Sequence, residues 1–172
     1  AFIRYPRGEG VGKPIKPDPR ILPIGKAAVE KEGADIVIWA LGNMVQTALE
    51  VAEDIERQIE ACVGVVNARF AKPLDTALLV EQARAASLIV TLEDAAVTGG
   101  FGSAVAEELQ DQGIQAPVCR FGWPDRFVDH ATTATELREQ NGLGKSQIVS
   151  RVVRHPTIKN VFDLAPTAGA RS

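Results

Sequence analysis

The sequence has few of the residues that build metal, redox or disulfide sites. Its 172 residues include two cysteines, Cys62 and Cys119, and two histidines, His130 and His155, all far apart along the chain. Without a Cys-x-x-Cys pair or a histidine cluster, neither a zinc site nor a disulfide framework is expected. Both cysteines lie at the edges of apolar runs, so we expect them to be buried and reduced.

A charge excess of one sign and long apolar runs are missing as well. The 19 Lys and Arg face 22 Asp and Glu, and the net charge of −3 argues against a nucleic-acid or anionic membrane partner. Apolar runs such as residues 36–41 fall far short of the roughly 20 residues of a membrane helix. The first residues also lack a signal-peptide pattern. We therefore expect a cytoplasmic protein with no membrane partner.

Proline and glycine are unevenly distributed and divide the chain into three segments. Residues 1–23 contain five prolines and cannot form one helix or central strand, so they are predicted to be a linker following a preceding domain. Residues 24–154 alternate apolar strand patterns with amphipathic helix patterns and are predicted to be one domain. Residues 155–172 have weak structural signals, and we expect a mobile C-terminal extension.

The alternation of strands and helices predicts the fold class. Strands are predicted at residues 24–30, 36–41, 63–68, 88–92 and 116–121, and helices at 44–59, 75–86, 103–112, 133–141 and 148–153. A glycine turn at Lys31-Glu32-Gly33 predicts a hairpin of the first two strands. The remaining strands, joined through helices, predict an α/β fold: a three-layer, mostly parallel sheet with one antiparallel strand.

Residues with capping chemistry mark the predicted helix ends. Asp75 and Ser103 are predicted to cap the helices that follow them. Thr133 and Glu136 have the spacing of a capping box. Gly113 is predicted to stop one helix, and Gly142 another.

Two arginines near the beginning of the chain could bind phosphate. Arg4 and Arg7 bracket Tyr5-Pro6, and the proline stiffens the backbone between their side chains. A planar guanidinium can donate two hydrogen bonds to phosphate oxygens. The alternative is that both are solvated surface arginines.

Three further stretches could carry chemistry. Gly99-Gly100-Phe101-Gly102-Ser103 enters a helix and could bind an anion, although a tight strand-to-helix turn fits its spacing better. Glu93 and Asp94 end a strand, where open α/β sheets often bind ligands, but they are read mainly as solvated or interface carboxylates. His130 could act as an acid or base, with a surface or interface role as the alternative.

Seven stretches together resemble the deoxyxylulose-phosphate synthase family, in the order seen there. They are Arg4-Tyr5-Pro6-Arg7-Gly8, Pro23-Ile24-Gly25-Lys26, Arg69-Phe70-Ala71-Lys72-Pro73-Leu74-Asp75, Thr91-Leu92-Glu93-Asp94, Gly99-Gly100-Phe101-Gly102-Ser103, Gly122-Trp123-Pro124-Asp125-Arg126-Phe127 and Gly142-Leu143. No single stretch decides the resemblance, but the ordered set does. It implies that residues 1–23 are the tail of a pyrimidine-binding domain and its linker, and residues 24–154 a transketolase C-terminal domain.

The resemblance also implies a reaction and its cofactors. The family is a transketolase-type, thiamine-diphosphate- and Mg²⁺-dependent transferase. It condenses pyruvate with glyceraldehyde 3-phosphate, with loss of CO₂, on the way to isoprenoids, thiamine and pyridoxal. Its cofactor motifs have no counterpart in this sequence, so this chain alone is expected to be inactive and to bind no cofactor. What carries over is Arg7 as the ligand of the acceptor phosphate, with Arg4 a second candidate, in a homodimer completed by N-terminal and middle domains.

Two alternatives remain open. Ala27 and the segment Gly42-Asn43-Met44-Val45 are also familiar from the β subunits of 2-oxo-acid dehydrogenases, whereas residues 4–8 and 69–75 favour the synthases. A stand-alone, non-enzymatic interaction domain with the same fold is the other alternative.

Overall fold

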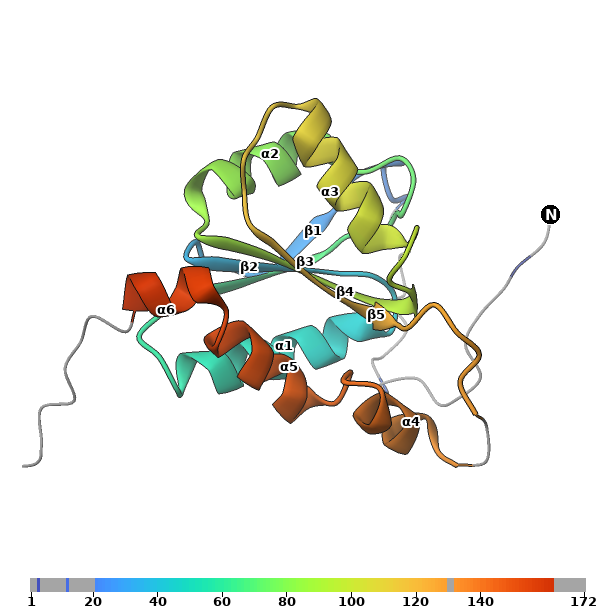
Figure 1. Ribbon diagram of the computed structural model, residues 1–172. Helices are drawn as coiled ribbons and strands as arrows, with labels where there is room; N and C mark the ends of the chain where they lie inside the picture. The colour runs from blue at the N-terminus through green and yellow to red at the C-terminus, as the bar shows by residue number, and fades with distance from the viewer. Residues whose placement is uncertain (1–2, 4–11, 13–20, 130–131, 163–172) are drawn as a thin grey trace, which may run out of the picture.

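The computed structural model describes residues 21–129 and 132–162, together with residues 3 and 12. In chain order the elements are β1 (Ala28–Lys31), β2 (Ile36–Ala40), α1 (Met44–Glu56), β3 (Val63–Asn67), α2 (Thr76–Ala85), β4 (Leu88–Ala96), α3 (Phe101–Asp111), β5 (Val118–Trp123), α4 (Ala134–Gln140), α5 (Lys145–Val153) and α6 (Pro156–Phe162). Helices α2 and α3 cover one face of the sheet, and α1 and α5 cover the other (Figure 1). The predicted three-layer α/β fold is confirmed.

The sheet has the strand order β1-β3-β2-β4-β5 and is parallel except for β1. One antiparallel strand was predicted, but the predicted hairpin is wrong, because β1 pairs with β3 and not with β2. Both edges of β2 are taken by its parallel partners β3 and β4. At Gly33 the connection lies against the backbone of Val63 and Gly64, and a Cβ there would come within 2.3 Å of the Gly64 nitrogen.

Strand β2 lies at the centre of the core, and all five of its residues are buried, as its apolar run predicts. Its side chains alternate between the two faces of the sheet. Ile36 and Ile38 pack into the cluster under α1 and α5, whereas Val37 and Trp39 pack into the cluster under α2 and α3. The Trp39 indole N–H donates to Gln82 at 2.8 Å, which explains why a polar residue lies on the inner face of α2.

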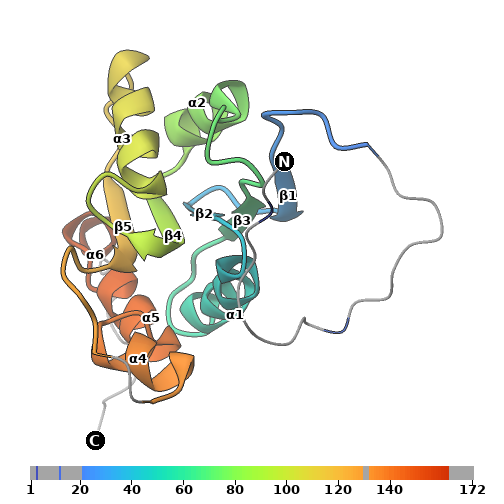
Figure 2. The same ribbon diagram turned by 90° about the vertical axis from the view of Figure 1, so that its right-hand side faces the viewer.

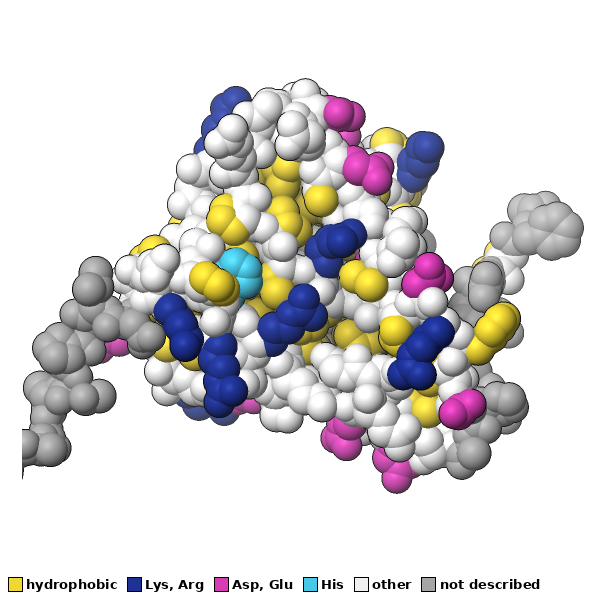
Figure 3. Space-filling view, viewed as in Figure 1, with side chains coloured by type: hydrophobic (Ala, Val, Ile, Leu, Met, Phe, Trp, Pro, Cys, Tyr) yellow, Lys and Arg dark blue, Asp and Glu magenta, His cyan; other side chains and the backbone are white. Residues whose placement is uncertain are grey.

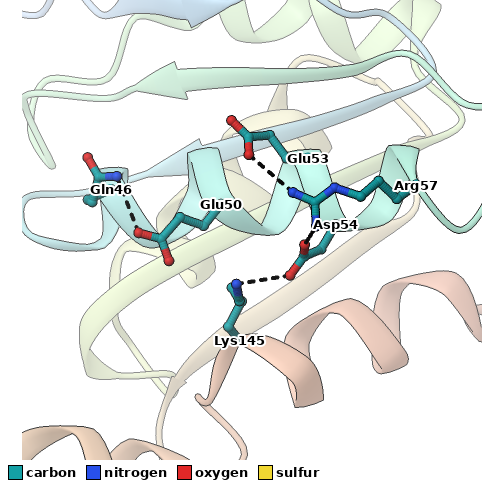
Figure 4. Close-up of polar contacts among 6 residues, drawn as sticks. All are labelled: Gln46, Glu50, Glu53, Asp54, Arg57 and Lys145. Carbon is teal, nitrogen blue, oxygen red and sulfur yellow. Dashed lines mark hydrogen bonds and ion pairs between the residues drawn. The ribbon is translucent and has the colours of Figure 1, made fainter.

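Helix α1 shows the predicted apolar stripe, with five buried residues that recur at three- and four-residue intervals. Its outer side carries charged residues, one of which, Asp54, also contacts α5. Asp54 pairs with Arg57 on the same helix and, at 3.1 Å, with Lys145 at the start of α5 (Figure 4). The Lys145 ammonium, together with Arg57, holds the pKa of Asp54 below its usual range.

The predicted helix ends are partly confirmed. Thr133 and Glu136 form both hydrogen bonds of the capping box, and Gly113 and Gly142 have the positive φ of a residue just past a helix end. Asp75 is the N-cap residue of α2 but makes no capping hydrogen bond there. Its carboxylate instead accepts hydrogen bonds from the Lys26 ammonium and the Ala27 N–H.

Two further predictions need correction. Cys119 is buried, but Cys62 is exposed, because it lies just before β3, where its N–H donates to the Asp35 carboxylate at 2.7 Å. The extension predicted to be mobile from residue 155 begins with α6, which buries Ile158 against the core. A two-turn helix with one buried residue, Ile158, and one partly buried residue, Phe162, gives a weak periodic signal. The division of the chain into residues 1–23, 24–154 and 155–172 stays a prediction.

Candidate functional site

The carboxyl ends of the parallel strands meet at one edge of the sheet, where open α/β folds place their ligand sites. Figure 2 shows the strands nearly end-on between α1 on one side and α2 and α3 on the other. Strand β4 runs past its last partner on β2, Leu92, to Ala96, and its register with β5 shifts between these residues. Glu93 and Asp94 lie in this shifted stretch.

Glu93 is buried, with 1% of its surface exposed, and its carboxylate faces the first turn of α3. One oxygen accepts the Phe101 N–H at 2.7 Å, and the other accepts the Gly102 N–H at 2.8 Å. The expectation of a solvated or interface carboxylate is therefore wrong for Glu93. The anion position at the N-terminus of α3 is occupied by a side chain of the protein itself, which satisfies N–H groups that every helix leaves free.

The glycines of the Gly99–Ser103 loop make this close approach possible. A Cβ at Gly100 would lie 2.2 Å from both the Ala96 carbonyl and the Glu93 carboxylate, and one at Gly102 would lie 2.4 Å from the Thr91 hydroxyl. Gly99 has a φ of +68°, which favours glycine. The loop is thus a tight strand-to-helix turn closed around Glu93.

Ser103 stabilises this turn and does not cap α3, whose N-cap residue is Gly100. Its hydroxyl donates to the Val97 carbonyl at 3.1 Å and accepts from the Gly99 N–H at 3.1 Å and from the Arg120 guanidinium at 2.7 Å. Each of these partners is a structural donor or acceptor, and none is a base that could take the hydroxyl proton. Ser103 therefore has the contacts of a structural residue.

Asp94 joins three separate elements at the same edge. Its carboxylate accepts from the Asn43 amide at 2.6 Å, the Trp123 indole at 2.7 Å and the Arg138 guanidinium at 2.9 Å. Burial raises the pKa of Asp94, but these hydrogen bonds and the Arg138 charge outweigh it and hold that pKa below its usual range. Asp94 therefore ties the start of α1, the end of β5 and α4 together, which the sequence did not predict.

This network also lies at the point where the chain changes direction across the sheet. From the central β2, the chain first adds β3 on one side and then β4 on the other. Asn43, which follows Gly42 at the end of β2, reaches across this point to Asp94. At this switch point, a common ligand position in such folds, an exposed hydrogen bond therefore joins the segments that follow β2 and end β4.

The remaining predicted site residues lie apart from this edge or outside the described residues. Arg4, Arg7 and His130 lie outside the described residues, so their roles stay predictions. In the loop after β5, Arg126 donates to Asn141 at 3.3 Å, and Phe127 is fully exposed, at 102%.

Two observations on the described residues concern the family's cofactor. Within it, no group of three or more His, Cys, Asp and Glu could hold a metal ion such as the Mg²⁺ that accompanies thiamine diphosphate. The α3 N-terminus, which could otherwise take a diphosphate, accommodates Glu93. No described helix has both the length and the apolar character needed to cross a membrane.

The comparison with protein families decides what this domain is. Residues 25–148 match the family described as "Transketolase, C-terminal domain". The chain belongs to this family. The match runs from Gly25 through the first residues of α5, and so includes the sheet and the closed carboxyl edge.

Curated relatives of this transketolase C-terminal domain are named 1-deoxy-D-xylulose-5-phosphate synthase. Those of Thermomicrobium roseum, Acidobacterium capsulatum and Gloeothece citriformis are 49%, 44% and 47% identical over 88%, 90% and 88% of this chain. In each case the match covers 24% of the relative. The chain thus spans about a quarter of the length of these relatives.

Solved structures agree with the family assignment. A split-gene transketolase, described as an "inactive beta4 tetramer", is 39% identical to this chain and superposes on it with a TM-score of 0.72. The match covers 84% of this chain and 45% of the transketolase chain. A Pichia stipitis transketolase in complex with sedoheptulose 7-phosphate has a TM-score of 0.54 at 16% identity and covers 80% of this chain and 19% of its own. The second likeness supports the fold alone.

Proposed function

We propose that this chain is the C-terminal part of a cytoplasmic 1-deoxy-D-xylulose-5-phosphate synthase. The observation that carries the proposal is the 44–49% identity to synthases over nearly the whole chain, confined to about a quarter of their length. In this role the chain would contribute to assembly and present Arg7 to the phosphate of glyceraldehyde 3-phosphate, with Arg4 beside it. The other substrate would be pyruvate.

The carboxyl edge of the sheet supports a role for this chain in assembly and not in cofactor binding. Glu93 and Asp94 accept hydrogen bonds from groups of the domain itself, and Glu93 takes the anion position at the N-terminus of α3. We therefore propose that thiamine diphosphate and Mg²⁺ bind to the preceding N-terminal and middle domains. There the cofactor supplies the decarboxylation of pyruvate and the joining of its remaining carbons to the aldehyde.

Exposed apolar side chains support the assembly role. Ile21, Leu22 and Ile24 are 95%, 49% and 79% exposed in the segment that leads into β1, and Val29 on β1 is 39% exposed. Burying such side chains is favourable, and this segment continues directly from the residues that would join the preceding domains. We assign it to contact with those domains, in a homodimer. The split-gene transketolase is described as an inactive tetramer, which is consistent with the proposal that the present chain assembles but cannot act alone.

A chimera tests the proposal. This chain would replace the matching C-terminal quarter of the Thermomicrobium roseum synthase, and product formation would be measured against both substrates. The chimera should be active, and Arg7→Ala should raise the KM for glyceraldehyde 3-phosphate by about tenfold or more, because a charged hydrogen bond to phosphate is lost. The KM for pyruvate should stay nearly unchanged.

Two control variants make the test specific. Lys16→Ala removes a positive charge from the same segment and should leave both KM values unchanged, whereas Arg4→Ala should have an effect between these two. An unchanged acceptor KM in Arg7→Ala would contradict the role of Arg7. A folded chimera without activity would contradict the assignment to the synthases.

A further inference from the structure

A shallow hollow of about 740 Å³ lies where α5 passes into α6, and no residue of the carboxyl edge lines it. It is lined by Ser146, Gln147, Ser150, Arg151, Arg154, His155 and Pro156. Figure 3 shows that Lys and Arg side chains gather around the histidine on this face. All of its polar lining residues can donate hydrogen bonds, and none is a carboxylate.

The two arginines have no anionic partner in the described part of the chain, where neither takes part in an ion pair. Asp54 lines a neighbouring hollow together with Arg154. Asp54 is already paired with Lys145 and Arg57 (Figure 4). Within residues 21–129 and 132–162, no carboxylate is therefore paired with Arg151 or Arg154.

Part of the lining is held in place before any ligand arrives. The guanidinium of Arg151 lies over the Phe121 ring, 4.7 Å from its centroid, and this cation–π contact favours its position beside the hollow. His155 accepts the Thr157 N–H at Nδ1, 3.4 Å away. Burial, and then the charge of Arg151, lower the pKa of His155, so the ring is neutral at pH 7 and donates from Nε2.

We propose that this hollow binds a small phosphate-bearing anion. Arg151 and Arg154 would supply the charge, and the hydroxyls of Ser146 and Ser150 would supply neutral donors. The volume is within the range of about 300–1,000 Å³ that is usual for small-molecule sites. The site goes beyond the proposed function, because it does not involve Arg7.

Inorganic diphosphate is the probe, titrated into the ¹⁵N-labelled 172-residue chain at constant ionic strength. Amide signals of residues 146–156 should shift and saturate, whereas those of residues 99–103 should stay in place. Arg154→Gln should weaken binding by about tenfold, because a charged hydrogen bond is lost. Arg151→Gln should do the same if its melting temperature shows that the stack on Phe121 is not needed for folding.

The matched control is Lys159→Gln, which removes the same charge from α6 but from a residue that does not line the hollow. It should change the affinity by less than about twofold, because a screened surface charge acts weakly at a distance. Shifts that never saturate, or equal losses in the Lys159 and Arg154 variants, would overturn the proposal and leave the arginines as complements of the C-terminal end of α5. Arg7→Gln should leave the diphosphate-induced shifts of residues 146–156 unchanged, so failure of the chimera and failure of this site are separate results.

Discussion

The carboxyl edge of the sheet and the α5–α6 hollow differ in whether their charged side chains have partners within the domain. At the edge, Glu93 and Asp94 accept hydrogen bonds from five donors of the domain itself. In the hollow, Arg151 and Arg154 have no carboxylate partner among the described residues. Charges at the edge therefore belong to folding, whereas charges in the hollow are available for binding. Variants in the two regions should separate stability from affinity.

Removal of the Glu93 carboxylate should have the largest effect. Glu93→Ala leaves the buried N–H groups of Phe101 and Gly102 without their acceptor and opens a cavity, and should lower the free energy of unfolding by about 3 kcal/mol. Glu93→Gln keeps one acceptor and should cost about half as much. Urea denaturation followed by circular dichroism measures both. A loss below about 1 kcal/mol in Glu93→Ala would show that the edge is not closed by this residue.

Adding a methyl group at Gly100 should be nearly as damaging. The new Cβ would lie 2.2 Å from the Ala96 carbonyl and the Glu93 carboxylate, so Gly100→Ala should destabilise by about 2–3 kcal/mol. The neighbouring Gly99→Ala meets open space and should cost only about 1 kcal/mol, because of its positive φ. Melting temperatures of the two variants check the order. Equal losses would indicate that close packing around Glu93 is unimportant.

Asp94 should contribute a pH-dependent share of the stability. Because its pKa is lowered in the folded state, its contribution is fully present above the unfolded value near 3.9 and is lost as the pH falls through the folded pKa. Asp94→Asn should therefore be less stable by about 1 kcal/mol at pH 7. Unfolding curves from pH 7 to pH 2.5 should show the gap closing in acid. A gap that is constant with pH would contradict the charged network.

Neutralising the hollow should have the smallest effect on stability. Arg154 is exposed and without an ion pair in the described residues, so Arg154→Gln should change the free energy of unfolding by about 0.5 kcal/mol or less. The same denaturation experiment measures this change. A loss of unfolding free energy as large as that of Asp94→Asn would show that Arg154 stabilises the fold. The two regions would then not differ in the way described.

The sequence predicts those features that depend on neighbours within one or two turns. The stripe of α1, the buried β2 and the Thr133–Glu136 box follow from local spacing and are confirmed. The pairing of β1 with β3 does not follow from local spacing. The residue pattern of a strand contains no information on which neighbouring strand has a free edge. A sequence with a short turn favours a hairpin, whereas here both edges of β2 are taken.

The closed edge was missed because its contacts join residues that no periodic pattern connects. Alternation along β4 indicated that Glu93 and Asp94 point to opposite faces, but not that a helix N-terminus lies at one face and Asn43, Trp123 and Arg138 at the other. A signal was present in the glycines at 100 and 102, since small residues at a helix start permit close approach of another group. The specific role of Arg7 as the ligand of the acceptor phosphate, by contrast, is predicted only by the family resemblance.

The central claim is that this domain closes its own carboxyl edge and depends on other domains for the cofactor. Calorimetric titration of thiamine diphosphate with Mg²⁺ into the isolated 172-residue chain and into the active chimera tests it most directly. The account predicts saturable binding to the chimera and no measurable binding to the isolated chain. Tight binding to the isolated chain would contradict it.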